Sequence, residues 1–208
     1  MGRQPLVMTA LHTLLALTYP VLIYLALGVA SPRVVALCAL ALLAARLSLV
    51  APARLVTVVR LARLPAVAFA SANLASALWN DAASLLLTPA LVSFALLLAF
   101  GLSFRQPETV IETFARDQLG TLAPEERAYC RKVTALWCAF FFGNGAVAAQ
   151  LAVAGSREAW ALYTGCIAYV LLGLLFASEF VYRQWRFRRY MGAPTDVLFR
   201  RIFPPNPP

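Results

Sequence analysis

Long apolar runs with few charged residues divide the chain, and short polar stretches separate them. Each run is close to the about 20 residues that a helix needs to cross the hydrocarbon core of a bilayer. The pattern predicts transmembrane helices over residues 6–29, 33–50, 61–79, 83–104, 133–154 and 158–182. We therefore expect an all-α, polytopic membrane bundle of about six transmembrane helices that forms a single domain.

The boundary between the second and third spans is the least regular part of the pattern. Arg54, Arg60 and Arg63 interrupt the apolar residues there. Because charged side chains are costly inside hydrocarbon, we expect an interfacial turn before the third span. Asn80 and Asp81 then favour a turn between spans three and four, although they could also line a polar vestibule.

The polar connection over residues 105–132 carries helix signals of its own. Pro107 can begin a helix, and the apolar residues that follow lie on one face of it. This pattern is typical of an amphipathic helix that lies in the headgroup plane. A second helix is expected to begin at Pro124, where a proline is followed by two acidic residues, and to continue into span five.

Composition supports a membrane location. Hydrophobic residues make up 62% of the chain and charged residues 13%, whereas a soluble domain has about 45–50% and about 25%. Of the 18 lysines and arginines, only Arg33 and Arg157 fall on one side of a six-span topology. Basic residues gather on the cytoplasmic side, so the sequence predicts both termini in the cytoplasm and a basic cytoplasmic tail over residues 183–208. Membrane lipids, and not nucleic acid, are the partners that this distribution favours.

No motif in the chain predicts catalysis, a metal or a cofactor. His12 is the one histidine, the four cysteines lack CxxC spacing, and neither a P-loop nor GxGxxG is present. The sequence therefore does not favour an enzymatic function. The cysteines are expected to act as small apolar residues, although Cys130 lies in the polar connection and could be reactive or lipidated.

Two polar residues inside the spans are candidate functional groups, because polar side chains are costly there. Asn144 lies between Gly143 and Gly145 near the middle of span five. It could form an interhelical hydrogen bond in a tightly packed seam, or it could line a ligand cavity. Glu179 lies near the cytoplasmic end of span six, where it could pair with Arg183 four residues later, bind a headgroup or relay a proton.

Three further candidates come from the cytoplasmic connection. Glu112, Arg116 and Arg131 lie on or near the expected interfacial helix, where they could contact headgroups or a partner. Several aromatic residues fall near span ends, which is typical of an aromatic belt at the membrane surface; these are Trp137, Trp160, Tyr163, Tyr169, Tyr182 and Trp185.

Four segments of the second half resemble a known family. They are Pro107–Arg116 (PETVIETFAR), Tyr129–Gly145 (YCRKVTALWCAFFFGNG), Glu158–Tyr163 (EAWALY) and Gly173–Glu179 (GLLFASE). Together they resemble small bacterial inner-membrane proteins encoded in aryl-polyene and fatty-acid-type biosynthesis gene clusters. The resemblance covers roughly residues 80–183, and the chain departs from it at Thr88 and Lys132. It implies a bacterial inner-membrane location and an acyl-lipid context, and it assigns no activity.

Several functional hypotheses remain open at this point. The first is a membrane component of an acyl-lipid or aryl-polyene pathway whose basic cytoplasmic face docks acidic acyl carrier or synthase partners, or holds anionic lipid. The second is a small lipid or lipid-precursor transporter with a cavity near Asn144, Glu179 and the prolines of spans one and four. A structural subunit of a larger membrane complex is a third. An interfacial enzyme using Glu108, Glu112 and Arg131 is the least favoured.

Overall fold

The computed structural model describes residues 19–49, 52–188 and 201–202, and within these ranges the chain is helical almost throughout, with no strand. Residues 19–26 are the described part of the first helix. The following elements are α2 (Pro32–Leu49), α3 (Pro52–Trp79), α4 (Ala82–Ser103), α5 (Val110–Leu119), α6 (Pro124–Ala154), α7 (Arg157–Leu162), the π-helix η1 (Tyr163–Ile167) and α8 (Ala168–Phe187). The predicted all-α class is confirmed.

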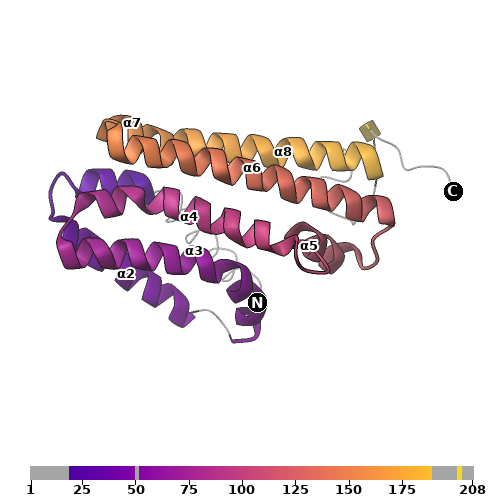
Figure 1. The fold of residues 1–208 in the computed structure, drawn as a ribbon, viewed down its shortest axis with the longest axis horizontal. Coiled ribbons are helices and arrows are strands. Elements are labelled where there is room, and N and C mark those ends of the chain that lie inside the picture. The colour runs from indigo at the N-terminus through magenta and orange to yellow at the C-terminus, as the bar shows by residue number, and fades with distance from the viewer. Residues whose placement is uncertain (1–18, 50–51, 189–200, 203–208) are drawn as a thin grey trace.

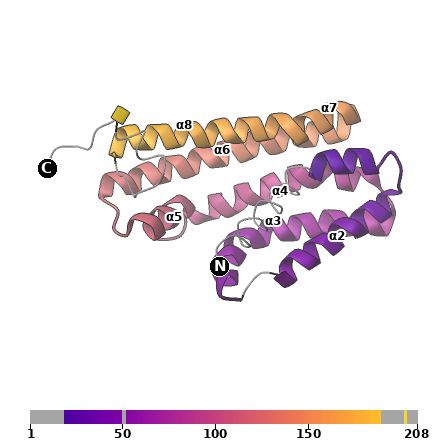
Figure 2. The ribbon, with the colours of Figure 1, turned by 180° about the vertical axis from the view of Figure 1, so that it is seen from behind.

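The long helices lie side by side along the long axis of the molecule. Helix α4 lies between α3 and α6, while α2 covers the far side of α3 and α8 runs along α6 (Figure 1). The same order is visible from behind (Figure 2). Helix α5 lies at one end of the bundle and α7 at the other, and residues 19–26 lie near the α7 end.

Three of the described elements are long and apolar enough to cross a membrane. They are Ala82–Ser103, Pro124–Ala154 and Arg157–Phe187, the last of which joins α7, η1 and α8. The described part of α2 contributes a shorter apolar helix, Pro32–Ala45. Large apolar side chains on α8 are exposed, including Val170, Leu174 and Phe176. Lipid is the natural environment for such surfaces, so these helices indicate a membrane-embedded protein.

The expected turn before the third span is wrong. Helix α3 begins at Pro52 and continues to Trp79, with Pro65 inside it. A proline suits the first turn of a helix, because the amide that it lacks would have no helical partner there. Charged side chains interrupt the apolar run at Arg54, Arg60 and Arg63, but they do not interrupt the backbone hydrogen bonds that form a helix. Helix α3 therefore continues through these residues.

The turn expected at Asn80 and Asp81 is present and joins α3 to α4. Asn80 has a positive φ of 54° and accepts a hydrogen bond from the Arg33 backbone amide. The Arg33 side chain donates to the carbonyls of Ala77 and Leu78 at the end of α3. Asp81 caps α4 by accepting from two backbone amides, which holds its pKa below the usual aspartate value. Turn formation thus explains both residues.

The connection between α4 and α6 holds the two helices that the sequence predicts. Helix α5 begins at Val110 and not at Pro107, because Thr109 and Glu112 form a capping box. The Glu112 carboxylate accepts from the Thr109 amide at 2.5 Å, and the Thr109 hydroxyl accepts from the Glu112 amide at 3.4 Å. Helix α6 begins at Pro124 and runs without a break to Ala154, so that prediction is confirmed.

Two apolar clusters hold the helices together. One lies toward the α7 end and includes Leu85 and Trp160, both 0% exposed. The other lies toward the α5 end and centres on Val133, Trp137 and Phe141. Trp137 and Trp160 therefore belong to the core and not to an aromatic belt. The indole of Trp160 also donates to the Leu86 carbonyl at 2.9 Å, so its polar group is satisfied within the protein.

Candidate functional site

A cavity of about 620 Å³ lies between the two apolar clusters. Its walls come from residues 19–30, α2, α4, α6, η1 and α8, with Phe69 of α3. This volume is within the range of small-ligand sites, which is about 300–1,000 Å³. The cavity brings together residues from nearly every part of the described chain.

The walls of the cavity are mostly apolar. The lining residues within the described ranges include no charged side chain. Leu22, Val34 and Leu42 line the cavity while being 49%, 50% and 56% exposed. The cavity is therefore open, and not enclosed, along α2 and the segment before it.

Asn144 supplies the central polar group of the cavity. Its Nδ2 donates to Ser93 Oγ on α4 at 2.9 Å, and its Oδ1 accepts from the Tyr163 hydroxyl at 3.1 Å. These bonds join α4, α6 and η1 around one amide. An asparagine amide can make four hydrogen bonds, so the two bonds use half of its capacity.

Local breaks in helix geometry position both partners of Asn144. Ser93 lies four residues after Pro89, and its hydroxyl donates to the Pro89 carbonyl at 2.9 Å while accepting from Asn144. Tyr163 is the first residue of the π-helix η1. A π-helix turn is wider than an α-helical one and occurs frequently at functional sites.

The π-helix also packs closely against the segment before α2. A Cβ added at Gly165 would lie 2.9 Å from Val21 Cγ2, so only glycine fits without a shift of that side chain. Thr164 and Pro20 line the cavity beside this contact. The contact therefore holds η1 close to the segment before α2, beside the cavity.

Thr88 on α4 and Tyr19 on the first helix form a second polar part of the cavity lining. Thr88 is 1% exposed, and its hydroxyl donates to the Ser84 carbonyl. The Tyr19 hydroxyl lies beside Thr88 and Asn73, yet it is buried without a well-formed hydrogen bond within the described part of the chain. A buried polar group left in this state costs about 1–3 kcal/mol. A ligand with a polar group would complete the hydrogen bonding of this hydroxyl.

Glu179 lies away from the cavity. Its carboxylate is 3.5 Å from Arg183 Nε, which confirms the i,i+4 ion pair, and it accepts from the Tyr129 hydroxyl at 3.3 Å. Tyr129 stacks on Tyr182 with ring centroids 5.7 Å apart. These contacts fasten α6 to α8 at the α5 end of the bundle.

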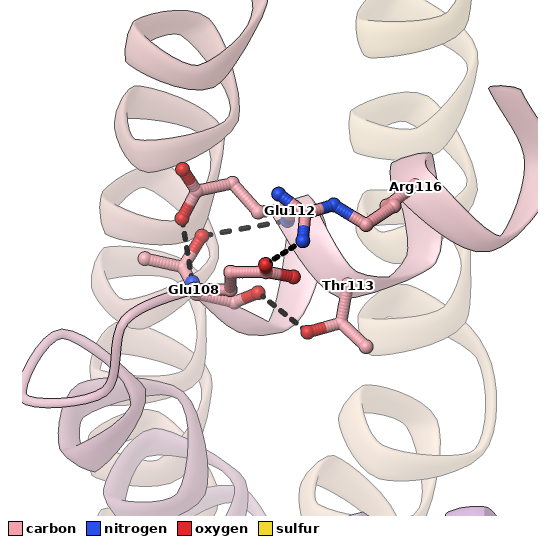
Figure 3. A network of polar contacts seen from close by, with 5 residues as sticks. Glu108, Glu112, Thr113 and Arg116 are labelled. Carbon is pink, nitrogen blue, oxygen red and sulfur yellow. Dashed lines mark hydrogen bonds and ion pairs between the residues drawn. The ribbon is translucent and has the colours of Figure 1, made fainter. Parts of the chain in front are cut away.

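The interfacial candidates lie at the same end as Glu179. Glu112 is buried at 4% exposure in its capping box, while Arg116 pairs with Glu108 (Figure 3). The Arg131 guanidinium lies 5.5 Å from the centroid of the Phe104 ring. These contacts are structural, since each fastens α5 or α6 to a neighbouring segment.

The structure separates candidates that the sequence grouped. Asn144, Pro20 and Pro89 line one cavity, as the transporter hypothesis expects, whereas Glu179 does not lie in its described lining. Sequence reasoning missed the roles of Ser93 and Tyr163. The position of Ser93 one helical turn after Pro89 is the sequence signal that could have identified it. The sequence predicts Tyr163 as part of an aromatic belt, and no neighbouring residue distinguishes that role from a hydrogen bond to Asn144.

Cys130 is 5% exposed, so burial argues against the reactive or lipidated role. Within the described ranges, no group of three or more His, Cys, Asp and Glu side chains could hold a metal ion.

Comparisons with protein-family models, curated proteins and solved structures found no match to this chain. The resemblance of its second half to small membrane proteins of aryl-polyene gene clusters therefore stays a prediction.

Proposed function

We propose that this chain is a six-span bacterial inner-membrane protein that holds a hydrocarbon-chain ligand, a lipid or a lipid precursor, in the cavity around Asn144. In this proposal it is an accessory component of an acyl-lipid or aryl-polyene pathway, and it binds or passes on the ligand without catalysing a reaction.

The observation that carries the proposal is the cavity itself. It is large, mostly apolar and open toward the exposed apolar surface of α2 and the first helix. A hydrocarbon chain that enters from the bilayer is already out of water, so its gain comes from close packing against the apolar walls and not from the hydrophobic effect. Such a chain needs an entry that does not require passage through water. An opening along α2 and the first helix of a membrane helix bundle provides that route.

The test fills the cavity by substitution. Ala168 on α8 lines the cavity, and Ala177 on the same helix is exposed. We expect the Ala168→Trp variant to lose the lipid that co-purifies with the wild-type chain, as measured by native mass spectrometry. The Ala177→Trp variant is the matched control and should retain it. Equal lipid content in Ala168→Trp and wild type would contradict the proposal.

The six spans and the cytoplasmic termini are also part of the proposal. The basic residues support this orientation, because Arg33 and Arg157 alone among the 18 basic residues would face outward. Reporter fusions at the two ends provide the test. Both should give the cytoplasmic signal, and opposite signals would refute an even number of spans.

A second candidate function uses the end of the bundle near α5. Arg105, Arg127 and Lys132 are exposed there, and so is the apolar side chain of Phe114 on α5. Acidic acyl carrier proteins complement such a basic surface, and charge complementarity raises the association rate. In this proposal the basic end brings a soluble acyl donor close to the membrane.

Charge neutralisation tests the second candidate. The triple variant Arg105→Gln, Arg127→Gln and Lys132→Gln should lower the association rate with an acidic acyl carrier protein at low salt. The Arg157→Gln variant changes an exposed arginine at the opposite end of the bundle and serves as the control. Binding that is unchanged in the triple variant would exclude this surface.

A further inference from the structure

We infer that the cavity selects a neutral, single-chain amphiphile whose headgroup both donates and accepts hydrogen bonds, such as a monoacylglycerol. The inference rests on the proposed function and adds the chemical class of the ligand. Three independent features support it: the size of the cavity, the charge of its walls and the state of its polar groups.

Size limits the hydrocarbon part to one chain. The cavity volume of about 620 Å³ lies within the about 300–1,000 Å³ of small-ligand sites. One long acyl chain with a small headgroup belongs to this size class. A phospholipid, which has two such chains and a larger headgroup, does not fit inside the cavity.

The walls select against a charged headgroup. The lining within the described ranges offers no arginine, lysine or histidine that could pair with a carboxylate or phosphate. An ionised group that is moved from water into such surroundings without a partner is strongly disfavoured. An ionised fatty acid therefore cannot place its headgroup beside Asn144, whereas a neutral ester or alcohol can.

The polar groups of the cavity are suited to a headgroup with several hydrogen-bonding atoms. Among the described residues, Asn144 makes two of its four hydrogen bonds, and the Tyr19 hydroxyl is buried beside Thr88 and Asn73 without a well-formed bond. Ser93 is bonded to Asn144, and Thr88 lies beside Tyr19. Ser93 and Thr88 are five residues apart on α4. That separation corresponds to about 7–8 Å along the helix. A glycerol ester, with a carbonyl and two hydroxyls, spans this distance better than a lone alcohol does.

The experiment uses the full chain in nanodiscs of two-chain phosphatidylethanolamine and phosphatidylglycerol. This choice avoids detergents, which are single-chain amphiphiles themselves. Three probes carry the same diazirine-bearing acyl chain as a monoacylglycerol, a free fatty acid or a phosphatidylglycerol. After photolysis, fragmentation mass spectrometry assigns the labels to single residues, either in the cavity walls, such as Leu172 on α8, or on outward faces, such as Leu174 on the same helix.

We expect the monoacylglycerol probe to label the cavity walls. The fatty acid should do so only at a pH low enough to protonate it, and the phosphatidylglycerol should label outward faces alone. Loss of a hydrogen bond typically changes an equilibrium by about fivefold, so the Asn144→Leu variant should reduce cavity labelling by at least about that factor. Tyr163→Phe keeps Asn144 but removes the hydroxyl that orients its Oδ1, so it should give a smaller reduction, while Tyr182→Phe is the control outside the cavity.

The possible outcomes separate this inference from the proposed function. Equal labelling of the walls by the ionised fatty acid or by the phosphatidylglycerol would overturn the inference and leave the proposed function intact. Unchanged labelling in both folded variants, Asn144→Leu and Tyr163→Phe, would do the same. Exclusion of all three probes from the cavity would overturn both.

Discussion

Two glycines on α6 lie two residues apart and have different surroundings. A Cβ added at Gly143 would meet no atom within 4 Å, whereas one at Gly145 would lie 3.0 Å from Phe94 Cε1 and 3.2 Å from Phe94 Cδ1. Gly145 is buried and Gly143 is exposed. We therefore expect the same substitution to alanine to have different effects on stability at the two positions.

The magnitudes follow from two opposing terms. Alanine stabilises a helix interior by about 1 kcal/mol relative to glycine, and this gain applies at both positions. At Gly145 the new methyl group approaches the Phe94 ring several tenths of an ångström too closely, and overpacking of this kind costs roughly 1–3 kcal/mol. Gly143→Ala should therefore stabilise the fold by about 1 kcal/mol, and Gly145→Ala should leave it unchanged or destabilise it by up to about 2 kcal/mol.

Thermal unfolding in nanodiscs of one lipid composition measures the difference. For a chain of this length, 1 kcal/mol shifts the melting temperature by roughly 2–4 °C. Gly145→Ala should therefore melt at least about 2 °C below Gly143→Ala, with the wild type close to or between them. A Gly145→Ala variant that melts at or above Gly143→Ala would refute the close packing of α6 against Phe94 on α4.

Three further predictions concern other parts of the fold. Trp160→Phe removes the indole donor to the Leu86 carbonyl and shrinks a fully buried side chain, so the free energy of unfolding should fall by roughly 1–3 kcal/mol; a melting temperature equal to the wild type would contradict this. Asp81→Ala removes the cap of α4 and should cost about 1 kcal/mol at neutral pH. Because two backbone amides lower the pKa of Asp81 in the folded chain, this contribution is complete above the ordinary aspartate pKa and is lost as the pH falls through the lowered value. The difference in melting temperature between wild type and variant should therefore vanish in acid, and a persistent difference would argue against the cap. Cys130, which is 5% exposed, should resist a membrane-permeant maleimide in the folded chain and react after unfolding, as peptide mass spectrometry would show; rapid modification of Cys130 in the folded chain would mean that α6 is packed differently.

Features with a local chemical signal are those that the sequence predicts well. Proline and acidic residues at the start of a helix predicted α6 at Pro124, and the Asn80-Asp81 pair predicted the turn before α4. The pair of Glu179 and Arg183 follows from helix spacing alone. In each case the interacting residues lie within about one helical turn, so tertiary structure is not needed to find them.

Features that depend on distant residues could not be predicted in this way. Asn144 is bonded to Ser93 and Tyr163, which are 51 and 19 residues away, and Trp160 is bonded to a carbonyl 74 residues away. Hydropathy is also a weak guide to burial in a membrane protein, because lipid-facing and buried positions are both apolar. For this reason Trp160 was assigned to the membrane surface, although it is 0% exposed.

Asn144 unites two roles that the sequence presented as alternatives. Its bonds to Ser93 and Tyr163 make it an interhelical connection, and its place in the lining makes it part of a ligand cavity. The two roles are compatible because an amide can make four bonds and the described part of the protein uses two of them. The connection keeps the polar group satisfied when no ligand is bound, so the bundle can fold before it binds. The further hydrogen bonds that Asn144 can make, in an otherwise apolar space, then favour a ligand with a polar group that can form them.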